Sequence, residues 1–249
     1  MENLGDIFKF VNLELNKGQK SGIVTPVNFT TACRAGTLEL YVEARSFYEE
    51  NSTITDDSRA FVKTIGDSIN NTPLIANVSG VIDLPEDYRY FSSLSWLKTI
   101  SKPGCAVERK HIPVEWLTDD EWSVRVNSVL KGPSNRFPIC TIQNGKLLTA
   151  PIKSRYSLTY WKEPEIPFFD YIITNGAIVY LPPGAVHDGT NPDPAMVAGT
   201  PSRSVEPEWK ELKRFSDKVL RVLSASKRVE QIYQEASIEM AKQQQQWSK

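Results

Sequence analysis

Apolar and polar residues alternate most clearly from Arg155 to Tyr171, where the sequence reads RYSLTYWKEPEIPFFDY. On an extended backbone, one face carries Tyr156, Leu158 and Tyr160. The other face carries Ser157, Thr159 and Trp161. Bulky side chains occur on both faces, so we expect a strand that is at least partly covered on each side. Pro164 lacks the N–H that a central strand needs, so the strand is expected to end at Lys162 or Glu163.

The N-terminal part of the chain has the three- and four-residue spacing of amphipathic helices. Its first apolar stripe consists of Leu4, Phe8, Val11 and Leu15. This stripe predicts a helix over about 3–17. A second helix is expected over about 26–50, with Thr25 as its N-cap and Pro26 at its first position. Gly36 is an unfavourable residue in the interior of that helix.

The middle of the chain predicts a set of short strands. They are expected within 78–84, 89–107, 139–142, 146–150, 156–161 and 177–181. Asn144-Gly145 predicts a tight hairpin, because both residues tolerate positive φ. One helix is expected over 113–130, with the acidic residues Asp119–Glu121 near its start. The strands are too close together for helical crossovers, so the expected fold class is α+β with an antiparallel or mixed sheet.

The C-terminal part is expected to be helical, with two apolar stripes. The stripes consist of Trp209, Leu212, Phe215, Val219, Val222 and Leu223, then Val229, Ile232, Tyr233, Ala236 and Met240. The first helix also carries Lys210, Lys213, Arg214, Lys218 and Arg221. Acidic residues share its turns, so a solvent-exposed face with ion pairs is the preferred interpretation, and nucleic-acid binding is the alternative.

These patterns divide the chain into four segments within one structural unit. They are an N-terminal helical part (1–77), a β-rich body with one helix (78–183), a loop (184–206) and a C-terminal helical arm (207–249). The loop is rich in proline and glycine and is interpreted as a mobile insertion. The N-terminal residues lack the pattern of a secretory signal, and no run is long and apolar enough for a membrane span.

Composition and charge narrow the range of functions. The chain has 29 Lys and Arg against 30 Asp and Glu, so its net charge of −1 gives no overall attraction to nucleic acid or acidic membranes. Cys33, Cys105 and Cys140 are far apart and lack metal-site spacing, which indicates free thiols in a reducing cytoplasm. His111 and His187 are the only histidines, and neither has a setting typical of catalysis.

The residues therefore predict a protein that is not an enzyme and that holds no cofactor and no metal. Paired acids such as Asp56-Asp57 are interpreted as solvated, because adjacent acids on a helix point in different directions. The sequence contains no phosphate-binding, dinucleotide-binding, nucleophile-elbow or zinc-protease motif. An enzyme with an unrecognised site remains a competing hypothesis.

Four stretches, in order along nearly the whole chain, resemble the head-to-tail adaptor (connector) family of tailed bacteriophages, of the short-tailed type. They are KGQKSGIVTPVNF with the helix that follows, VIDLPEDYRYF, FPICTIQNGKLLTAP leading to LTYWKEPEIPFFDY, and the pair of terminal helices. The third is the most specific. Leu158, Tyr160, Trp161, Lys162 and Pro164 match the family's proline-punctuated pattern there. The 184–206 link departs from the family, because it is long and poor in acids.

The resemblance implies a virion structural protein that assembles in the host cytoplasm into a ring, twelve-fold, beneath the portal at the head–tail junction. Its implied partners are further copies of itself, the portal protein, and tail or further ring proteins. DNA passes through the channel without sequence-specific binding, and no membrane is involved. We expect a neutral or acidic bore, because a basic one would retain the DNA.

In this interpretation the terminal helices hold the interface. The expected interface residues are Trp209, Leu212, Phe215, Val219, Val229, Ile232, Tyr233, Met240 and Trp247. The two tryptophans stand out, because large aromatic residues are enriched in contacts between proteins. The alternatives are another tail component such as a stopper, or a nucleic-acid-binding accessory protein that uses the basic face from Lys210 to Arg221.

Overall fold

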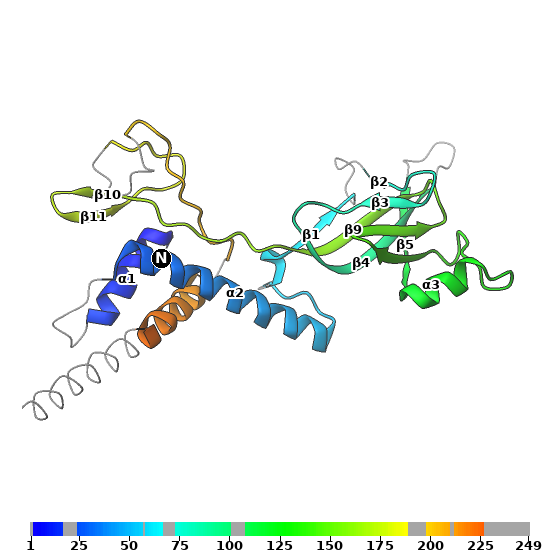
Figure 1. Ribbon diagram of the computed structural model, residues 1–249, viewed down its shortest axis with the longest axis horizontal. Helices are drawn as coiled ribbons and strands as arrows, with labels where there is room; N and C mark the ends of the chain where they lie inside the picture. The colour runs from blue at the N-terminus through cyan, green and yellow to red at the C-terminus, as the bar shows by residue number, and fades with distance from the viewer. Residues whose placement is uncertain are drawn as a thin grey trace, which may run out of the picture. The chain divides into compact units, whose positions relative to one another are not determined.

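The structure is a computed structural model, and it divides into two compact units (Figure 1). It describes residues 2–16, 24–56, 58–66, 73–100, 108–188, 198–209 and 212–226. The terminal unit consists of Met1–Ala60 and Pro164–Lys249, and the inserted unit consists of Phe61–Glu163. Helices near both ends and antiparallel and mixed sheets between them confirm the expected α+β class.

The terminal unit contains the predicted helices and one β-hairpin. Its elements are α1 (Leu4–Asn16), α2 (Pro26–Asn51), the 3-10 helix η1 (Ser58–Ala60), β10 (Tyr171–Thr174), β11 (Ala177–Tyr180) and a helix over 212–226. Thr25 caps α2 as expected, because its side chain accepts a hydrogen bond from the Asn28 N–H. The hairpin turns at Asn175 and Gly176, with φ of 52° and 77°.

The core of the terminal unit joins segments that are far apart in sequence. Phe8 from α1 and Phe29 from α2 both pack on Phe169, with ring centroids 4.7 and 5.2 Å away from it. The 212–226 helix packs on α2 around Gly36. A Cβ built on Gly36 would lie 3.5 Å from the side chains of Lys218 and Val219 and 3.7 Å from that of Phe215. α2 is therefore continuous through Gly36 and is anchored by this contact.

The inserted unit is formed by two sheets and one helix. Its elements are β1 (Val62–Ile65), β2 (Leu74–Ile75), β3 (Val81–Asp83), β4 (Tyr88–Ile100), β5 (Glu108–Pro113), β6 (Glu115–Trp116), α3 (Asp119–Val126), β7 (Ile139–Gln143), β8 (Lys146–Ala150) and β9 (Arg155–Lys162). One sheet has the order β1-β9-β4-β5, with β2 also on β9, and the other has the order β3-β8-β7-β6. Only β6 and β7 run parallel among the strand pairs of the described residues.

β9 is the central strand that the alternation predicts. Tyr156, Leu158 and Tyr160 are fully buried in a core cluster to which strands of both sheets contribute. On the opposite face Ser157 and Trp161 are 5% and 1% exposed, so both faces are covered. The strand ends at Lys162, as its prolines predict. Asn144 and Gly145 also form the expected turn between β7 and β8.

The predicted helix over 113–130 is wrong at both ends. Pro113 and Trp116 belong to β5 and β6, because their backbones pair with β4 and β7. α3 begins only after Thr118, which forms a capping box with Glu121. Beyond α3 the chain forms a loop, so the apolar residues near its end do not continue a helix.

The two ends of the inserted unit lie side by side. β1 pairs antiparallel with β9, with Val62 opposite Trp161. The Lys162 N–H then donates to the Phe61 carbonyl at 2.8 Å, so one hydrogen bond closes the inserted unit where the chain enters and leaves it. The compact units therefore differ from the four consecutive segments expected from the sequence, because residues 1–60 pack with residues that follow 163.

We predict that a fragment with residues 61–163 folds on its own, because its core and the pairing of its two ends lie within it. Cooperative unfolding in urea, followed by circular dichroism and tryptophan fluorescence, checks this. A shorter fragment, 73–163, lacks β1 and serves as the matched comparison. It should be clearly less stable. A disordered 61–163 fragment would contradict the prediction.

Replacing either of two helical glycines, Gly36 and Gly5, with alanine should change the free energy of unfolding in opposite directions. Gly36→Ala should raise the free energy of unfolding by about 0.5–1 kcal/mol, because its Cβ meets only ordinary van der Waals neighbours and alanine favours the helix. Gly5→Ala should lower it by about 1–3 kcal/mol, because its Cβ would lie 2.8 Å from the Tyr180 ring. Chemical denaturation of both variants measures these changes in the free energy of unfolding. Two changes of the same sign would contradict the prediction.

Candidate interaction surfaces

The described part of the expected interface is largely buried inside the chain. Trp209, Phe215 and Val219 are 6%, 1% and 0% exposed, and Leu212 is half-buried. Phe215 and Val219 face α2, so they serve the core of the terminal unit. The remaining expected residues, Val229, Ile232, Tyr233, Met240 and Trp247, lie outside the described residues.

The basic residues of the 212–226 helix form ion pairs with α2. Arg214 lies 3.3 Å from Glu43, Lys218 pairs with both Glu39 and Glu43, and Arg221 pairs with Glu39. The hydrogen bond from Lys218 is the main reason why the pKa of Glu43 is lowered. Much of the proposed nucleic-acid-binding face is thus neutralised within the terminal unit. Lys210 lies outside the described residues.

His187 belongs to a buried polar cluster. Its Nε2 lies 2.8 Å from Asp170 Oδ2, and both side chains are almost fully buried. Asp170 also accepts hydrogen bonds from the backbone N–H groups of Tyr171 and Arg203, both at 2.9 Å. The nearby Ser204 hydroxyl donates to the Leu181 carbonyl. Within the described parts of the 184–206 segment, His187 and Ser204 are thus buried, whereas most other residues are exposed or half-buried, and the mobility of the insertion stays a prediction.

The cysteines of the described residues are poor nucleophiles. Burial raises the pKa of Cys140 to about 12, and it raises that of Cys33 further, so both thiols stay protonated at neutral pH. Within the described ranges, no group of three or more His, Cys, Asp and Glu side chains is placed to hold a metal ion. Cys105 lies outside those ranges.

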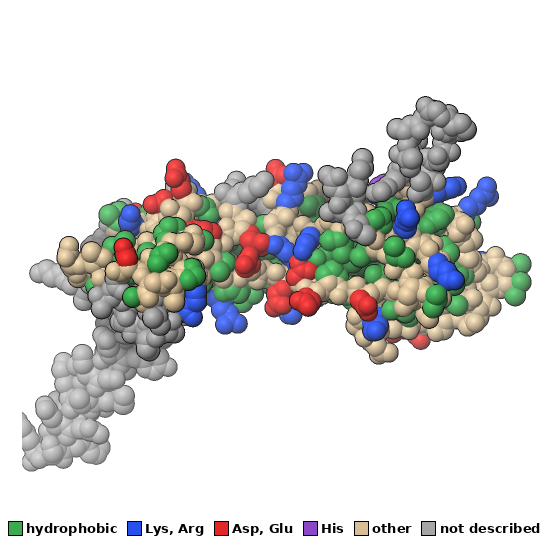
Figure 2. Space-filling view, turned by 90° about the horizontal axis from the view of Figure 1, so that it is seen from above, with side chains coloured by type: hydrophobic (Ala, Val, Ile, Leu, Met, Phe, Trp, Pro, Cys, Tyr) green, Lys and Arg blue, Asp and Glu red, His purple; other side chains and the backbone are tan. Residues whose placement is uncertain are grey.

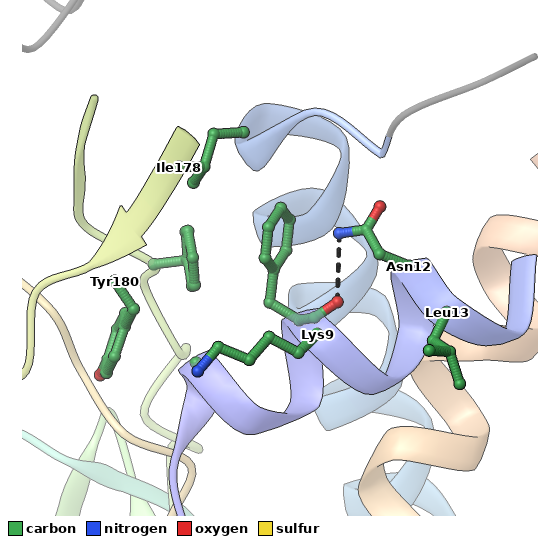
Figure 3. A pocket seen from close by; sticks show the side chains of 8 residues that line it. Lys9, Asn12, Leu13, Ile178 and Tyr180 are labelled. Carbon is green, nitrogen blue, oxygen red and sulfur yellow. Dashed lines mark hydrogen bonds between the residues drawn. The ribbon is translucent and has the colours of Figure 1, made fainter. Parts of the chain in front are cut away.

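An apolar pocket lies between α1 and the β10–β11 hairpin in the terminal unit (Figure 3). Its volume is about 640 Å³, and its apolar lining consists of Phe8, Leu13, Phe169, Ile178 and Tyr180. Lys9 and Asn12 add polar atoms, and the Asn12 side chain donates a hydrogen bond to the Phe8 carbonyl. We call this the α1 pocket. The sequence indicated an amphipathic α1, but it could not show that the hairpin leaves part of this face uncovered.

A second apolar surface lies on the 127–137 loop, which follows α3 in the inserted unit (Figure 1). Val129 and Leu130 are 99% and 96% exposed, and we call this pair the apolar tip. Phe137, at the other end of the loop, is also largely exposed. The sequence interpretation placed Val129 on a helix, so it missed this surface.

The surface shown in Figure 2 carries acidic and basic side chains interspersed with apolar ones, which agrees with the near-zero net charge. The described helices include none that is long and apolar enough to cross a membrane. Comparison with models of known protein families finds no match, and comparison with curated proteins finds none either.

The Glu43 ion pairs should make the stability of the terminal unit depend on pH. The pKa of Glu43 is lower in the folded chain than the ordinary value of about 4.3, so its contribution is present above that pH and is lost as the pH falls. Glu43→Gln should therefore lower the free energy of unfolding at pH 7, by at most about 1 kcal/mol for such partly exposed pairs. Urea unfolding at pH 7 and pH 3 measures this difference. It should be smaller at pH 3, whereas Glu50→Gln should have little effect at either pH.

Proposed function

We propose that this protein is a head-to-tail adaptor of a tailed bacteriophage, a virion structural protein that forms a ring under the portal. The observation that carries the proposal is the place of the segment that resembles the adaptor family. Leu158 and Tyr160 form the centre of the inserted unit, and the same segment continues through Pro164 into the terminal unit, where Phe169 joins the core.

The contacts of this segment favour a structural role for the matched residues. The Tyr160 hydroxyl donates to Asp87 at 2.6 Å, and Lys63 lies 2.9 Å from the other oxygen of the same carboxylate. Pro164 and Pro167 are buried beyond the end of β9. Residues that match the family's pattern thus hold the chain where one compact unit ends and the other begins. This arrangement suits a protein whose task is to connect partners.

The surfaces outside this segment also suit an assembly protein. The α1 pocket and the apolar tip lie on different units, so one chain presents two separate apolar surfaces. A ring repeats such contacts in every copy, and weak individual contacts then give a stable assembly. The ion pairs of Arg214, Lys218 and Arg221 with α2 favour the adaptor over a nucleic-acid-binding accessory protein.

In the proposed role the ring, twelve-fold, would extend the DNA channel below the portal and present a docking surface for tail proteins. DNA would pass through a neutral or acidic bore without sequence-specific contacts. Another tail component such as a stopper is the alternative within the same virion.

Electron microscopy of the purified protein, alone and mixed with the portal of the same phage, tests the proposal. We expect an additional ring of density on the portal. Lys213→Glu changes an exposed side chain of the 212–226 helix and should leave this ring intact. A protein that never adds to the portal would contradict the proposal. Loss of DNA retention by Lys213→Glu, with the ring unchanged, would favour the accessory protein.

A further inference from the structure

The β4–β5 hairpin of the inserted unit continues past the strand beside it in the sheet (Figure 1). β4 pairs with β9 as far as Trp96, which lies opposite Tyr156. From Leu97 to Ile100, β5 is the only strand that pairs with β4 within the described residues, and β5 is the last strand of that sheet. This end of the hairpin, 97–100 with 108–111, is therefore a two-stranded ribbon.

Two lysines lie directly opposite each other on this ribbon. Lys98 of β4 is in register with Lys110 of β5, and both side chains are exposed. Residues that face each other across an antiparallel pair have Cβ atoms about 5 Å apart, so two like charges there repel. In the part of the chain whose side chains are described, neither lysine has an ion-pair partner. An anion that binds between the two ammonium groups would remove this repulsion.

Further cations lie at the same end of the inserted unit. Arg155 begins β9 one residue before the last β4–β9 pair, and Lys153 lies in the 151–154 turn that leads from β8 into β9. Both side chains are exposed. Figure 2 shows Lys and Arg side chains gathered over one end of the inserted unit. We call Lys98, Lys110, Lys153 and Arg155 the basic end.

Acidic residues are scarce in the segments that meet at the basic end. No Asp or Glu occurs in 73–82, 92–100, 109–114 or 147–158. Asp83 and Glu115, which border these segments, pair with other cations of the inserted unit. Glu108 is the single acid of the ribbon, against three Lys and Arg. The net charge of −1 is therefore unevenly distributed, and this end of the molecule is basic.

The shape and charge of this surface fit the backbone of double-stranded DNA. A duplex carries one negative charge per about 1.7 Å of its axis and no positive charge, which suits a surface with cations and few acids. Its major groove is about 12 Å wide and admits a two-stranded β-ribbon. A protein surface usually carries charges of both signs, so it is a poorer match. Contacts of lysine with phosphate position a protein on DNA without reading the base sequence.

We propose that the basic end binds the phosphate backbone of duplex DNA without sequence specificity, through Lys98 and Lys110 with Lys153 and Arg155 beside them. The inference goes beyond the proposed function, in which DNA only passes the protein. The basic end is a small part of a chain with a net charge of −1, so it is compatible with a bore that is neutral or acidic elsewhere.

Fluorescence anisotropy tests the proposal with the full chain and a labelled duplex of about 30 base pairs of arbitrary sequence, in about 50 to 200 mM NaCl. The wild type should bind at the lowest salt concentration and weaken as salt is added. Lys98→Gln combined with Lys110→Gln should weaken binding about tenfold or more at low salt. It should also make the slope of log K against log salt shallower by about 2, because each lost phosphate contact contributes about 1.

Arg34→Gln combined with Lys213→Gln is the matched control. It removes the same charge from two exposed residues of the terminal unit, so it should change neither the affinity nor the slope. Lys213 also belongs to the basic face that the sequence suggested for nucleic acid. An equal loss of binding in the control and in the lysine pair variant would overturn the proposal.

Lys110→Glu alone separates binding from folding. It places a carboxylate opposite Lys98, so it should raise the temperature of thermal unfolding while it weakens DNA binding at least about tenfold. A lower unfolding temperature would overturn the repulsive pair on which the inference rests.

Two results for the wild type would also overturn the proposal. One is the absence of duplex binding at the lowest salt concentration. The other is tighter binding of polyglutamate than of the duplex at the same salt concentration, because it would identify the partner of the basic end as an acidic polypeptide.

Discussion

The pairing of β1 with β9 is the constraint on which the rest of this structure depends. It brings Val62 opposite Trp161 and lets Lys162 donate to the Phe61 carbonyl, so the chain enters and leaves the inserted unit at neighbouring positions. Because of this closure, residues before Phe61 and after Glu163 can build one unit together. The Phe8, Phe29 and Phe169 cluster exists only because the two outer segments reach the same core.

β9 fulfils several requirements at once, which explains its sequence. It pairs with β4 along one edge and with β1 and β2 along the other, so it must be extended and free of proline over its whole length. Its inner face supplies Tyr156, Leu158 and Tyr160 to the core, and its outer face buries Trp161. Prolines immediately after it end the ladder, and the chain then leaves for the other unit. The most regular pattern in the sequence thus marks the most constrained strand.

Local signals made much of the fold predictable. Thr25 and Pro26 predicted the start of α2, and Asn144-Gly145 predicted the β7–β8 turn. The same kind of signal was present but missed at Asn175-Gly176, which forms the β10–β11 turn. Thr118 and Glu121 likewise have the spacing of a capping box, which would have predicted the true start of α3.

What could not be predicted depends on contacts between distant residues. An amphipathic stripe predicts that Phe215 and Val219 are buried, but it does not say whether a partner or the chain itself covers them, and α2 covers them. His187 looked like a loop residue, because its partner Asp170 precedes it by 17 positions and is recognisable only in the folded chain. The α1 pocket required knowledge of where the β10–β11 hairpin lies.

The two most exposed large apolar residues of the described chain lie next to each other on one loop. The core of the inserted unit fully buries large apolar side chains such as Tyr156 and Leu158. Val129 and Leu130 are nevertheless held in water by a turn that needs Gly132. Exposed apolar side chains favour aggregation unless a specific partner covers them. A turn that holds two such side chains in one conformation is therefore useful only when it binds a specific partner. A protein that works as one member of an assembly meets this condition, because its neighbours cover the surface that an isolated copy leaves open.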